Sequence, residues 1–165
     1  MEKDMNLASQ PAESNRLADH GEIANRLFFR LYQASNLMHK AGTSAVRKFG
    51  TTTQQWAVLG ALSRQQAESR GLSVKDLMEY LMVSRQSLTA ILDRLEAAGL
   101  IDRTRTEGDG RLRYVRLTDK GSKTWADMRP SIRGFYEAAL ADFSIEESYL
   151  LMRLLDRLSA GLAKL

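Results

Sequence analysis

The amino-acid sequence predicts a mainly α-helical domain with one small β-hairpin. Three observations support this fold class: apolar residues recur at helical spacing, serine or threonine N-caps precede several such segments, and two strand-like runs flank an Asp-Gly turn. The chain has 165 residues, enough for one well-packed domain but too few for two independent ones. Residues 1–21 are acidic and lack periodicity, so we expect a flexible tail followed by a single domain over 22–165.

Two helices are predicted first from their apolar faces. A helix over about 22–48 is indicated by a stripe of apolar residues at Ile23, Leu27, Leu31 and Met38. A second helix begins at Thr53, and its buried face consists of Trp56, Val58, Leu59 and Leu62.

The next two helices are short and are joined by a turn of about four residues, which matches the helix-turn-helix unit. The third begins at Ser73, which forms a capping box with Asp76. Ser84 is a suitable N-cap for the fourth, and Gly99 is a suitable C-terminal end. The fourth helix has apolar residues at i, i+3, i+4 and i+7, namely Leu88, Ile91, Leu92 and Leu95.

The C-terminal part begins with the hairpin, formed by IDRTRT, the turn EGDG and RLRYVRLT. Thr118 or Asp119 is expected to cap a fifth helix, and Pro130 is expected to kink or restart it. A last helix begins with a capping box of Ser144 and Glu147, followed by a leucine-rich stripe.

The hairpin is unusually basic. It carries five arginines: Arg103, Arg105, Arg111, Arg113 and Arg116. Charged residues protect exposed sheet edges from pairing, which is one explanation. Residues 1–22 have a net charge of −3, which leaves +7 on the remainder out of a total of +4. A basic body suggests an anionic partner, so a polyanion beside the hairpin is the alternative.

The order of helix, helix-turn-helix and basic hairpin describes a winged helix, in which the hairpin is the wing. The second helix of the unit can enter a DNA major groove, about 12 Å wide, by its N-terminus. Its first polar residues are Ser84, Arg85, Gln86, Ser87 and Thr89. Arg85, Gln86 and Thr89 lie largely opposite the apolar stripe and are expected to face outward. A helical hairpin with a polar face toward water has the same spacing, but the adjacent basic wing favours DNA binding.

Other classes of function find little support. The chain has no cysteine and only two histidines, so thiol chemistry and a histidine-rich metal site are disfavoured, although carboxylates alone can hold a hard cation. No catalytic or nucleotide-binding motif is present, so we expect neither an enzyme nor a bound cofactor or metal. No stretch approaches the roughly 20 apolar residues of a membrane span, and the N-terminus is not a signal peptide, which predicts a cytoplasmic protein.

Three stretches together resemble the MarR family of winged-helix transcription regulators, over about 22–162. They are TTTQQWAVLGAL, SVKDLMEYLMVSRQSLTAILDRLEAAGLIDR and DGRLRYVRLTDKG. The last fits the wing pattern D-x-R-x-x-x-[VI]-x-L-T through Asp109, Arg111, Val115, Leu117 and Thr118. The resemblance implies a homodimer in which N- and C-terminal dimerisation helices, about 22–48 and 119–165, interlock beside winged helices over about 52–118.

The resemblance also implies how DNA is bound. Arg111 enters the minor groove and is held by Asp109, which lowers the entropy that the guanidinium loses on insertion. Arg105 and Arg113 neutralise phosphates beside it, while Ser84 to Thr89 read the major groove. Thr53 and Gln54, near a helix N-terminus, are expected to hold a phosphate. The operator is double-stranded DNA with the symmetry of an imperfect palindrome, because a two-fold dimer presents half-sites about 10 base pairs apart.

Family members are commonly repressors that a small ligand, often an aromatic acid or phenol, releases from DNA. The residues predicted to bind such an effector are Arg30, Tyr32, His39, Trp56, Trp125 and Met128. Trp56, Trp125 and Met128 also fit a purely structural role in the core. Three alternatives remain open: activation instead of repression, a winged helix that acts only through protein contacts, and sequence-independent DNA binding.

Overall fold

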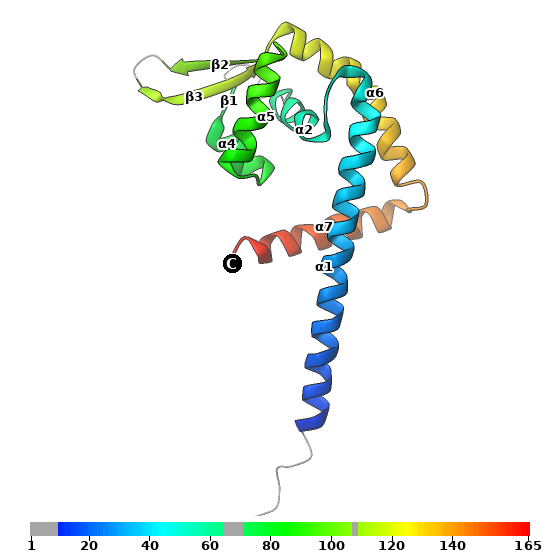
Figure 1. The fold of residues 1–165 in the computed structure, drawn as a ribbon. Helices are drawn as coiled ribbons and strands as arrows, with labels where there is room; N and C mark the ends of the chain where they lie inside the picture. The colour runs from blue at the N-terminus through cyan, green and yellow to red at the C-terminus, as the bar shows by residue number, and fades with distance from the viewer. Residues whose placement is uncertain (1–9, 65–70, 107–108) are drawn as a thin grey trace, which may run out of the picture. The chain divides into compact units, whose positions relative to one another are not determined.

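A computed structural model describes residues 10–64, 71–106 and 109–165 of the chain (Figure 1). These residues are mostly helical, as predicted, and the predicted hairpin belongs to a small antiparallel sheet of three strands. The chain divides into two compact units, Met1–Lys40 and Ala41–Leu165, and each is described by itself.

Helix α1 spans Gln10–Val46 and therefore begins well before Glu22, where the apolar stripe begins. The predicted start was wrong because periodicity detects a face that packs, whereas a helix can extend through a segment without such a face. In the part of the first unit whose side chains are described, most of the apolar stripe stays exposed: Ile23 has 62% of its surface accessible and Leu27 has 53%, whereas Leu31 is half-buried.

The second unit contains the winged helix. After the 3₁₀ turn Arg47–Phe49, helix α2 spans Thr53–Leu62 and begins with a capping box between Thr52 and Gln55. The helix-turn-helix unit comprises α4 over Val74–Leu81 and α5 over Arg85–Ala97. Ser73 and Asp76 form the predicted capping box of α4, with the Asp76 N–H donating to the Ser73 hydroxyl at 3.1 Å.

The sheet has the strand order β1–β3–β2, and both pairs are antiparallel. Strands β2, Ile101–Thr106, and β3, Asp109–Leu117, form the predicted hairpin. Strand β1, Leu72–Ser73, was not predicted, because two residues are too short to show strand alternation. Its Leu72 pairs with Val115, which fixes the start of α4 against the base of the wing.

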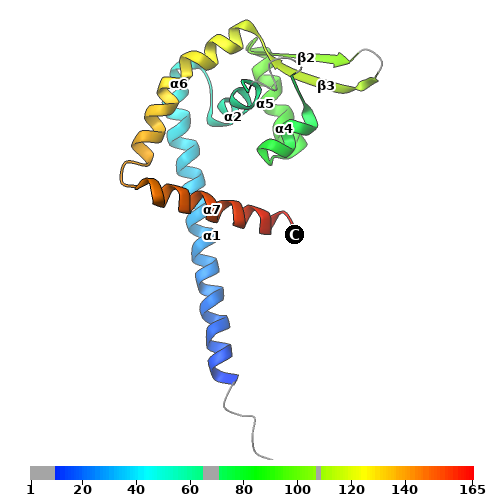
Figure 2. The ribbon, with the colours of Figure 1, turned by 180° about the vertical axis from the view of Figure 1, so that it is seen from behind.

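The last two helices are α6, Asp119–Ala139, and α7, Ile145–Leu162. Thr118 caps α6, and Ser144 with Glu147 forms the predicted capping box of α7. Helix α6 continues through Pro130 instead of restarting there, and its ribbon bends along its length (Figure 2).

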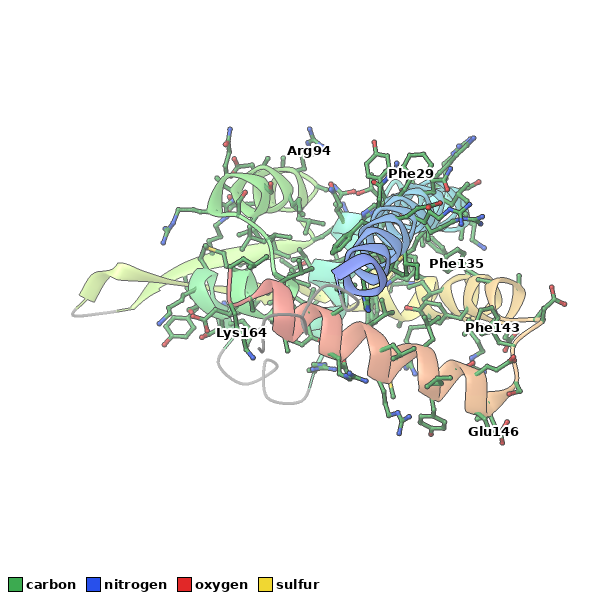
Figure 3. All side chains as sticks on the ribbon, turned by 90° about the horizontal axis from the view of Figure 1, so that it is seen from below. Phe29, Arg94, Phe135, Phe143, Glu146 and Lys164 are labelled. Carbon is green, nitrogen blue, oxygen red and sulfur yellow. The ribbon has the colours of Figure 1, made fainter. Side chains whose placement is uncertain are left out.

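The core lies where α2, α4, α5 and α6 meet the sheet. Its most deeply buried side chains are Val46, Val58, Leu59, Leu62, Leu77, Leu88, Leu92, Leu95, Ile101, Val115 and Met128. The apolar faces predicted for α2 and α5 are therefore confirmed as buried. By contrast, the leucine-rich stripe of α7 is exposed, including Leu150 at 47% and Leu154 at 47%, and Figure 3 shows side chains projecting from this helix.

Candidate nucleic-acid interface

The turn between α4 and α5 presents the N-terminus of α5. Met82 ends α4 in the left-handed conformation, with φ 51° and ψ 43°. Ser84 is the predicted N-cap, and its hydroxyl accepts the N–H of Ser87 at 3.2 Å. This cap satisfies one backbone donor of the first turn and begins the helix at Arg85.

The N-terminal half of α5 has one buried face and one exposed face. Leu88, Ile91 and Leu92 are buried in the core. All five residues predicted to read the major groove are exposed: Ser84, Arg85, Gln86, Ser87 and Thr89. The Thr89 hydroxyl donates to the carbonyl of Arg85 at 2.8 Å, which keeps it within its own helix. Arg85 and Gln86 therefore supply the long polar side chains with which this face can contact base edges.

The C-terminus of α5 is fastened to the start of α6. Gly99 adopts φ 68°, the left-handed conformation that glycine favours after a helix end. Its carbonyl accepts the Thr118 hydroxyl at 2.7 Å, and the Ala98 carbonyl accepts the Lys120 ammonium at 2.7 Å. The Leu100 carbonyl accepts the Thr118 N–H at 3.1 Å. These bonds satisfy the carbonyls of the three residues that directly follow α5, and they hold this segment against the start of α6.

The wing is the β2–β3 hairpin, with Arg105 opposite Arg113 and a register shift just after Arg105. The side chains of four predicted DNA contacts lie outside the described part of the structure: Arg105, Asp109, Arg111 and Arg113. Their backbone positions on the two strands are described, and their contacts with DNA stay predictions.

Arg103 has a different position from that expected of a wing arginine. Its side chain is only 14% exposed, and its guanidinium contacts two carboxylates of α5, those of Asp93 and Glu96. Strand alternation was the signal that sequence reasoning missed. Arg103 lies on the same sheet face as Ile101 and pairs with buried Val115, so it points toward α5.

The start of α2 is partly occupied by contacts within the fold. Thr53 is buried, its hydroxyl lies 2.9 Å from that of Thr43, and its backbone N–H donates to the same Thr43 hydroxyl at 3.2 Å. Gln54 is exposed. Of the two residues predicted to hold a phosphate, Gln54 has the more accessible side chain.

Comparison with known proteins agrees with this geometry. The sequence model of the MarR family matches residues 49–112. The transcriptional activatory protein BadR of Rhodopseudomonas palustris is 49% identical over 142 residues, which cover 83% of this chain and 81% of that protein. The chain belongs to the MarR family.

Further relatives extend the likeness of this MarR-family protein. The homoprotocatechuate degradative operon repressor of Escherichia coli is 32% identical over 115 residues, 70% of this chain and 75% of the relative. A structure of reduced AbfR bound to DNA is similar with a TM-score of 0.74 and 25% identity, and the match covers 87% of this chain and 97% of that one. The protein is thus a winged-helix transcription regulator and not an enzyme.

The six residues predicted to bind an effector are divided equally between the two compact units of this MarR-family regulator. Arg30, Tyr32 and His39 belong to the first unit and are exposed. Trp56 and Met128 are buried in the second unit. The remaining residue of the six, Trp125, is half-buried and packs against Gly60, where an added Cβ would lie 2.9 Å from the indole.

Trp56 belongs to an aromatic cluster. Its ring lies 5.7 Å from that of Phe135 and 5.8 Å from that of Tyr136, both with their edges toward a face. Burial raises the pKa of the Tyr136 phenol, and a hydrogen bond with Trp56 lowers this pKa by a smaller amount. Trp56 is buried and Phe135 is half-buried, whereas Tyr136 is 49% exposed, so the cluster lies at the edge of the core.

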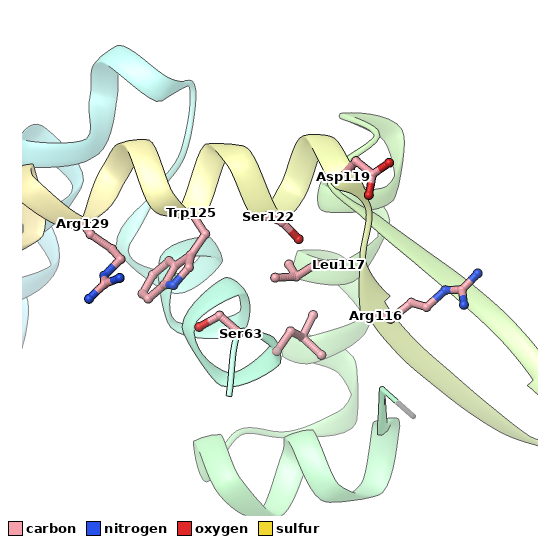
Figure 4. A pocket seen from close by; sticks show the side chains of 8 residues that line it. Ser63, Arg116, Leu117, Asp119, Ser122, Trp125 and Arg129 are labelled. Atoms are coloured by element: carbon pink, nitrogen blue, oxygen red, sulfur yellow. The ribbon is translucent and has the colours of Figure 1, made fainter. Parts of the chain in front are cut away.

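A cavity of about 430 Å³ lies between α2, the end of β3 and α6 (Figure 4). It is lined by Leu62, Ser63, Arg116, Leu117, Asp119, Ser122, Trp125 and Arg129. Trp125 is the one predicted effector residue that lines it. Its volume falls within the range of small-molecule sites, roughly 300–1,000 Å³.

The described residues offer neither a metal centre nor a membrane span. They contain no cluster of three or more histidine, cysteine, aspartate or glutamate side chains arranged to hold a metal ion. Within the same residues, no helix is both long enough and apolar enough to cross a membrane.

Proposed function

We propose that this MarR-family regulator is a homodimer that binds an imperfect palindromic operator in the cytoplasm and represses transcription until an aromatic or phenolic ligand releases it. The observation that carries the proposal is the exposed first turn of α5, with Arg85 and Gln86 facing outward beside a basic wing.

The roles at the interface follow from chemistry. Arginine can donate two hydrogen bonds to guanine and glutamine can pair with adenine, each pairing discriminating by about 1–3 kcal/mol. The exposure of Arg85 and Gln86 on the first turn of α5 supports these roles. Arg111, held by Asp109, enters the minor groove, and Arg105 and Arg113 neutralise neighbouring phosphates.

Dimerisation is supported by the apolar side chains that one chain leaves exposed. In the described residues they concentrate on α1 and α7, where the large ones are Ile23, Leu27, Phe28, Phe29, Leu37, Met38, Ile145, Leu150, Leu151, Met152, Leu154, Leu155 and Leu162. Monomeric proteins rarely leave so many large apolar side chains uncovered, and obligate dimers bury them against a second copy.

The effector class is supported by one relative and one cavity. The 32% identical relative is named as the repressor of a homoprotocatechuate degradative operon, and homoprotocatechuate is an aromatic acid with phenolic hydroxyls. The cavity beside Trp125 offers an indole surface together with Ser122 and Arg129, which suit an aromatic ring, a hydroxyl and a carboxylate.

Activation is the second candidate function, and the 49% identical relative favours it because its name is that of a transcriptional activatory protein. The same dimer on the same operator represses when the operator overlaps a promoter and activates when it lies where a bound dimer assists polymerase. Repression and activation therefore share one DNA-binding mechanism.

The test begins with selection of operators from a pool of randomised duplexes by the wild-type protein. We expect enrichment of a palindrome with half-sites about 10 base pairs apart. Fluorescence anisotropy then compares the selected duplex with a scrambled one at several salt concentrations. Equal affinity for both duplexes contradicts sequence-specific regulation, and no binding at low salt favours a role in protein contacts.

Two variants sharpen the test. Gln86→Ala should weaken binding to the selected duplex and relax the preference at one base pair, with little change for the scrambled duplex. Lys123→Ala, on the exposed surface of α6, is the control and should bind both duplexes as the wild type does. Transcription in vitro from a promoter that carries the operator, with and without candidate aromatic acids, then separates repression from activation.

A further inference from the structure

We propose that Arg103 is a positioning residue of the DNA interface, which neutralises two carboxylates of the recognition helix α5 and ties that helix to the wing. Arg103 does not bind phosphate in this arrangement. The inference rests on the proposed function, in which α5 enters the major groove.

The contacts of Arg103 leave little of it for DNA. Its Nη2 donates to Oδ1 of Asp93 at 2.5 Å, and its Nε lies 3.2 Å from Oε2 of Glu96 without the geometry of a hydrogen bond. The Arg103 side chain is 14% exposed, whereas those of Asp93 and Glu96 are 61% and 47% exposed. The guanidinium is therefore covered, and the two carboxylates form the outer surface.

The two carboxylates lie on a part of α5 that is expected to approach the DNA backbone. Asp93 is four residues after Thr89, so it lies one turn further along the same exposed face. Glu96 follows three residues later. A helix that enters a groove by its N-terminus brings this part of its face close to the DNA backbone, which carries one negative charge per roughly 1.7 Å of duplex.

Two uncompensated carboxylates at that position would repel the phosphates. Arg103 approaches them from β2, on the sheet face that packs against α5, and offsets one of their two charges. It also fixes the angle between α5 and the wing, because its two contacts lie on one helix while its backbone belongs to the hairpin. Major-groove and minor-groove contacts can then form together without reorganisation of the wing.

The experiment is a double-mutant cycle on the full-length protein. The variants are Arg103→Gln, the double change Asp93→Asn with Glu96→Gln, and all three changes combined. Lys123→Gln is the matched control, since it removes one positive charge that is likewise paired with a carboxylate, that of Asp127, on the exposed surface of α6. Affinity for the selected operator and for a scrambled duplex is measured by anisotropy at salt concentrations between about 50 and 200 mM, the range over which phosphate contacts show a strong salt effect.

We expect Arg103→Gln to weaken operator binding by about tenfold or more, because it leaves like charges facing each other. The slope of log affinity against log salt should stay close to that of the wild type. In the Arg103→Gln background, removal of both carboxylates should restore most of the lost affinity. In the wild-type background, the same removal should raise affinity by a smaller factor. Lys123→Gln should change affinity by less than about threefold, because its charge lies on α6, outside both the recognition helix and the wing.

If Arg103 instead bound a phosphate, the opposite pattern would appear and would overturn the proposal. The salt slope would then fall by about 0.9 for each phosphate that is no longer neutralised. The fold-change in affinity of the triple variant would equal the product of the fold-changes caused by the arginine change and by the carboxylate changes. A second cycle, on urea unfolding without DNA, tests the ion pairs themselves, and absence of coupling there also overturns the proposal. Failure of the proposed function is distinguishable, because it shows as equal binding of wild type to both duplexes whatever the variants do.

Discussion

The fastening of α5 to α6 predicts a large effect from a single methyl group at Gly121. This glycine lies in the first turn of α6, and an ideal Cβ built on it would be 1.9 Å from the carbonyl oxygen of Leu100 and 2.9 Å from the carbonyl carbon. Carbon and oxygen atoms in contact are normally separated by about 3.3 Å or more. The contact between the added Cβ and the Leu100 oxygen would be shorter than this normal distance by more than about 1 Å. Gly121→Ala therefore requires the two backbones to move apart by about that amount.

The magnitude follows from the bonds that such a separation would break. The three hydrogen bonds from Thr118 and Lys120 to the end of α5 contribute about 1 kcal/mol each. Overpacking of a tight contact costs about 1–3 kcal/mol. Separation of the backbones breaks the bonds but relieves the overlap, so the two costs do not add in full. We expect Gly121→Ala to lower the free energy of unfolding by about 3–5 kcal/mol.

Gly134→Ala is the matched control on the same helix. Nothing lies within 4 Å of a Cβ at Gly134, and its φ is not in the left-handed region. Alanine in place of glycine inside a helix should stabilise the protein by about 0.5–1 kcal/mol. Urea and thermal unfolding followed by circular dichroism, at one fixed protein concentration, measure both changes. The reasoning is refuted if Gly121→Ala unfolds within about 1 kcal/mol of the wild type, or if the two variants are destabilised alike.

Three further predictions follow from particular residues. Met82 is the non-glycine residue with positive φ in the described chain, and its side chain is 78% exposed, so Met82→Gly should raise the free energy of unfolding by about 0.5–1 kcal/mol; a fall of that size in urea unfolding would contradict it. Leu154→Glu places a charge on the exposed stripe of α7 and should convert a dimer to monomer in light scattering, whereas a dimer of unchanged stability would show that this stripe is not the interface. Burial raises the pKa of the Tyr136 phenol, so the stability that this group contributes is present below the unfolded pKa near 10 and is lost as pH rises through the folded pKa. Tyr136→Phe should reduce the loss of unfolding free energy between about pH 9 and about pH 11.5. An unchanged dependence of unfolding free energy on pH would exclude Tyr136 as the source of that loss.

Local sequence signals predicted most of the winged helix correctly. Ser73, Ser84 and Ser144 were predicted as N-caps, and Thr118 as one of two candidates, because a hydroxyl before an amphipathic segment satisfies helix donors whatever surrounds it. The buried face of α5 followed from helical periodicity in the same way. Such features depend only on neighbours in the chain, so one sequence is enough to find them.

Features that depend on residues far apart in the sequence were harder to predict. The start of α1 at Gln10 was missed because no apolar stripe marks it, and β1 was missed because its pairing with β3 joins residues far apart in sequence. For the effector residues, helical spacing placed aromatic side chains on inner faces but could not separate those in the core, such as Trp56, from one beside a cavity, such as Trp125.

The arginines of the wing show most clearly why residue type alone does not define a DNA interface. Arg103 and Arg116 lie on adjacent strands, and either one fits a basic patch when charges are counted along the sequence. Strand parity assigns them to opposite sheet faces, so Arg103 meets the carboxylates of α5 while Arg116 lines the cavity beside α6. Three of the five wing arginines then remain as candidate phosphate or minor-groove contacts: Arg105, Arg111 and Arg113. A dimer should consequently release fewer counterions than ten wing arginines would imply, and the measured salt slope of operator binding counts them directly.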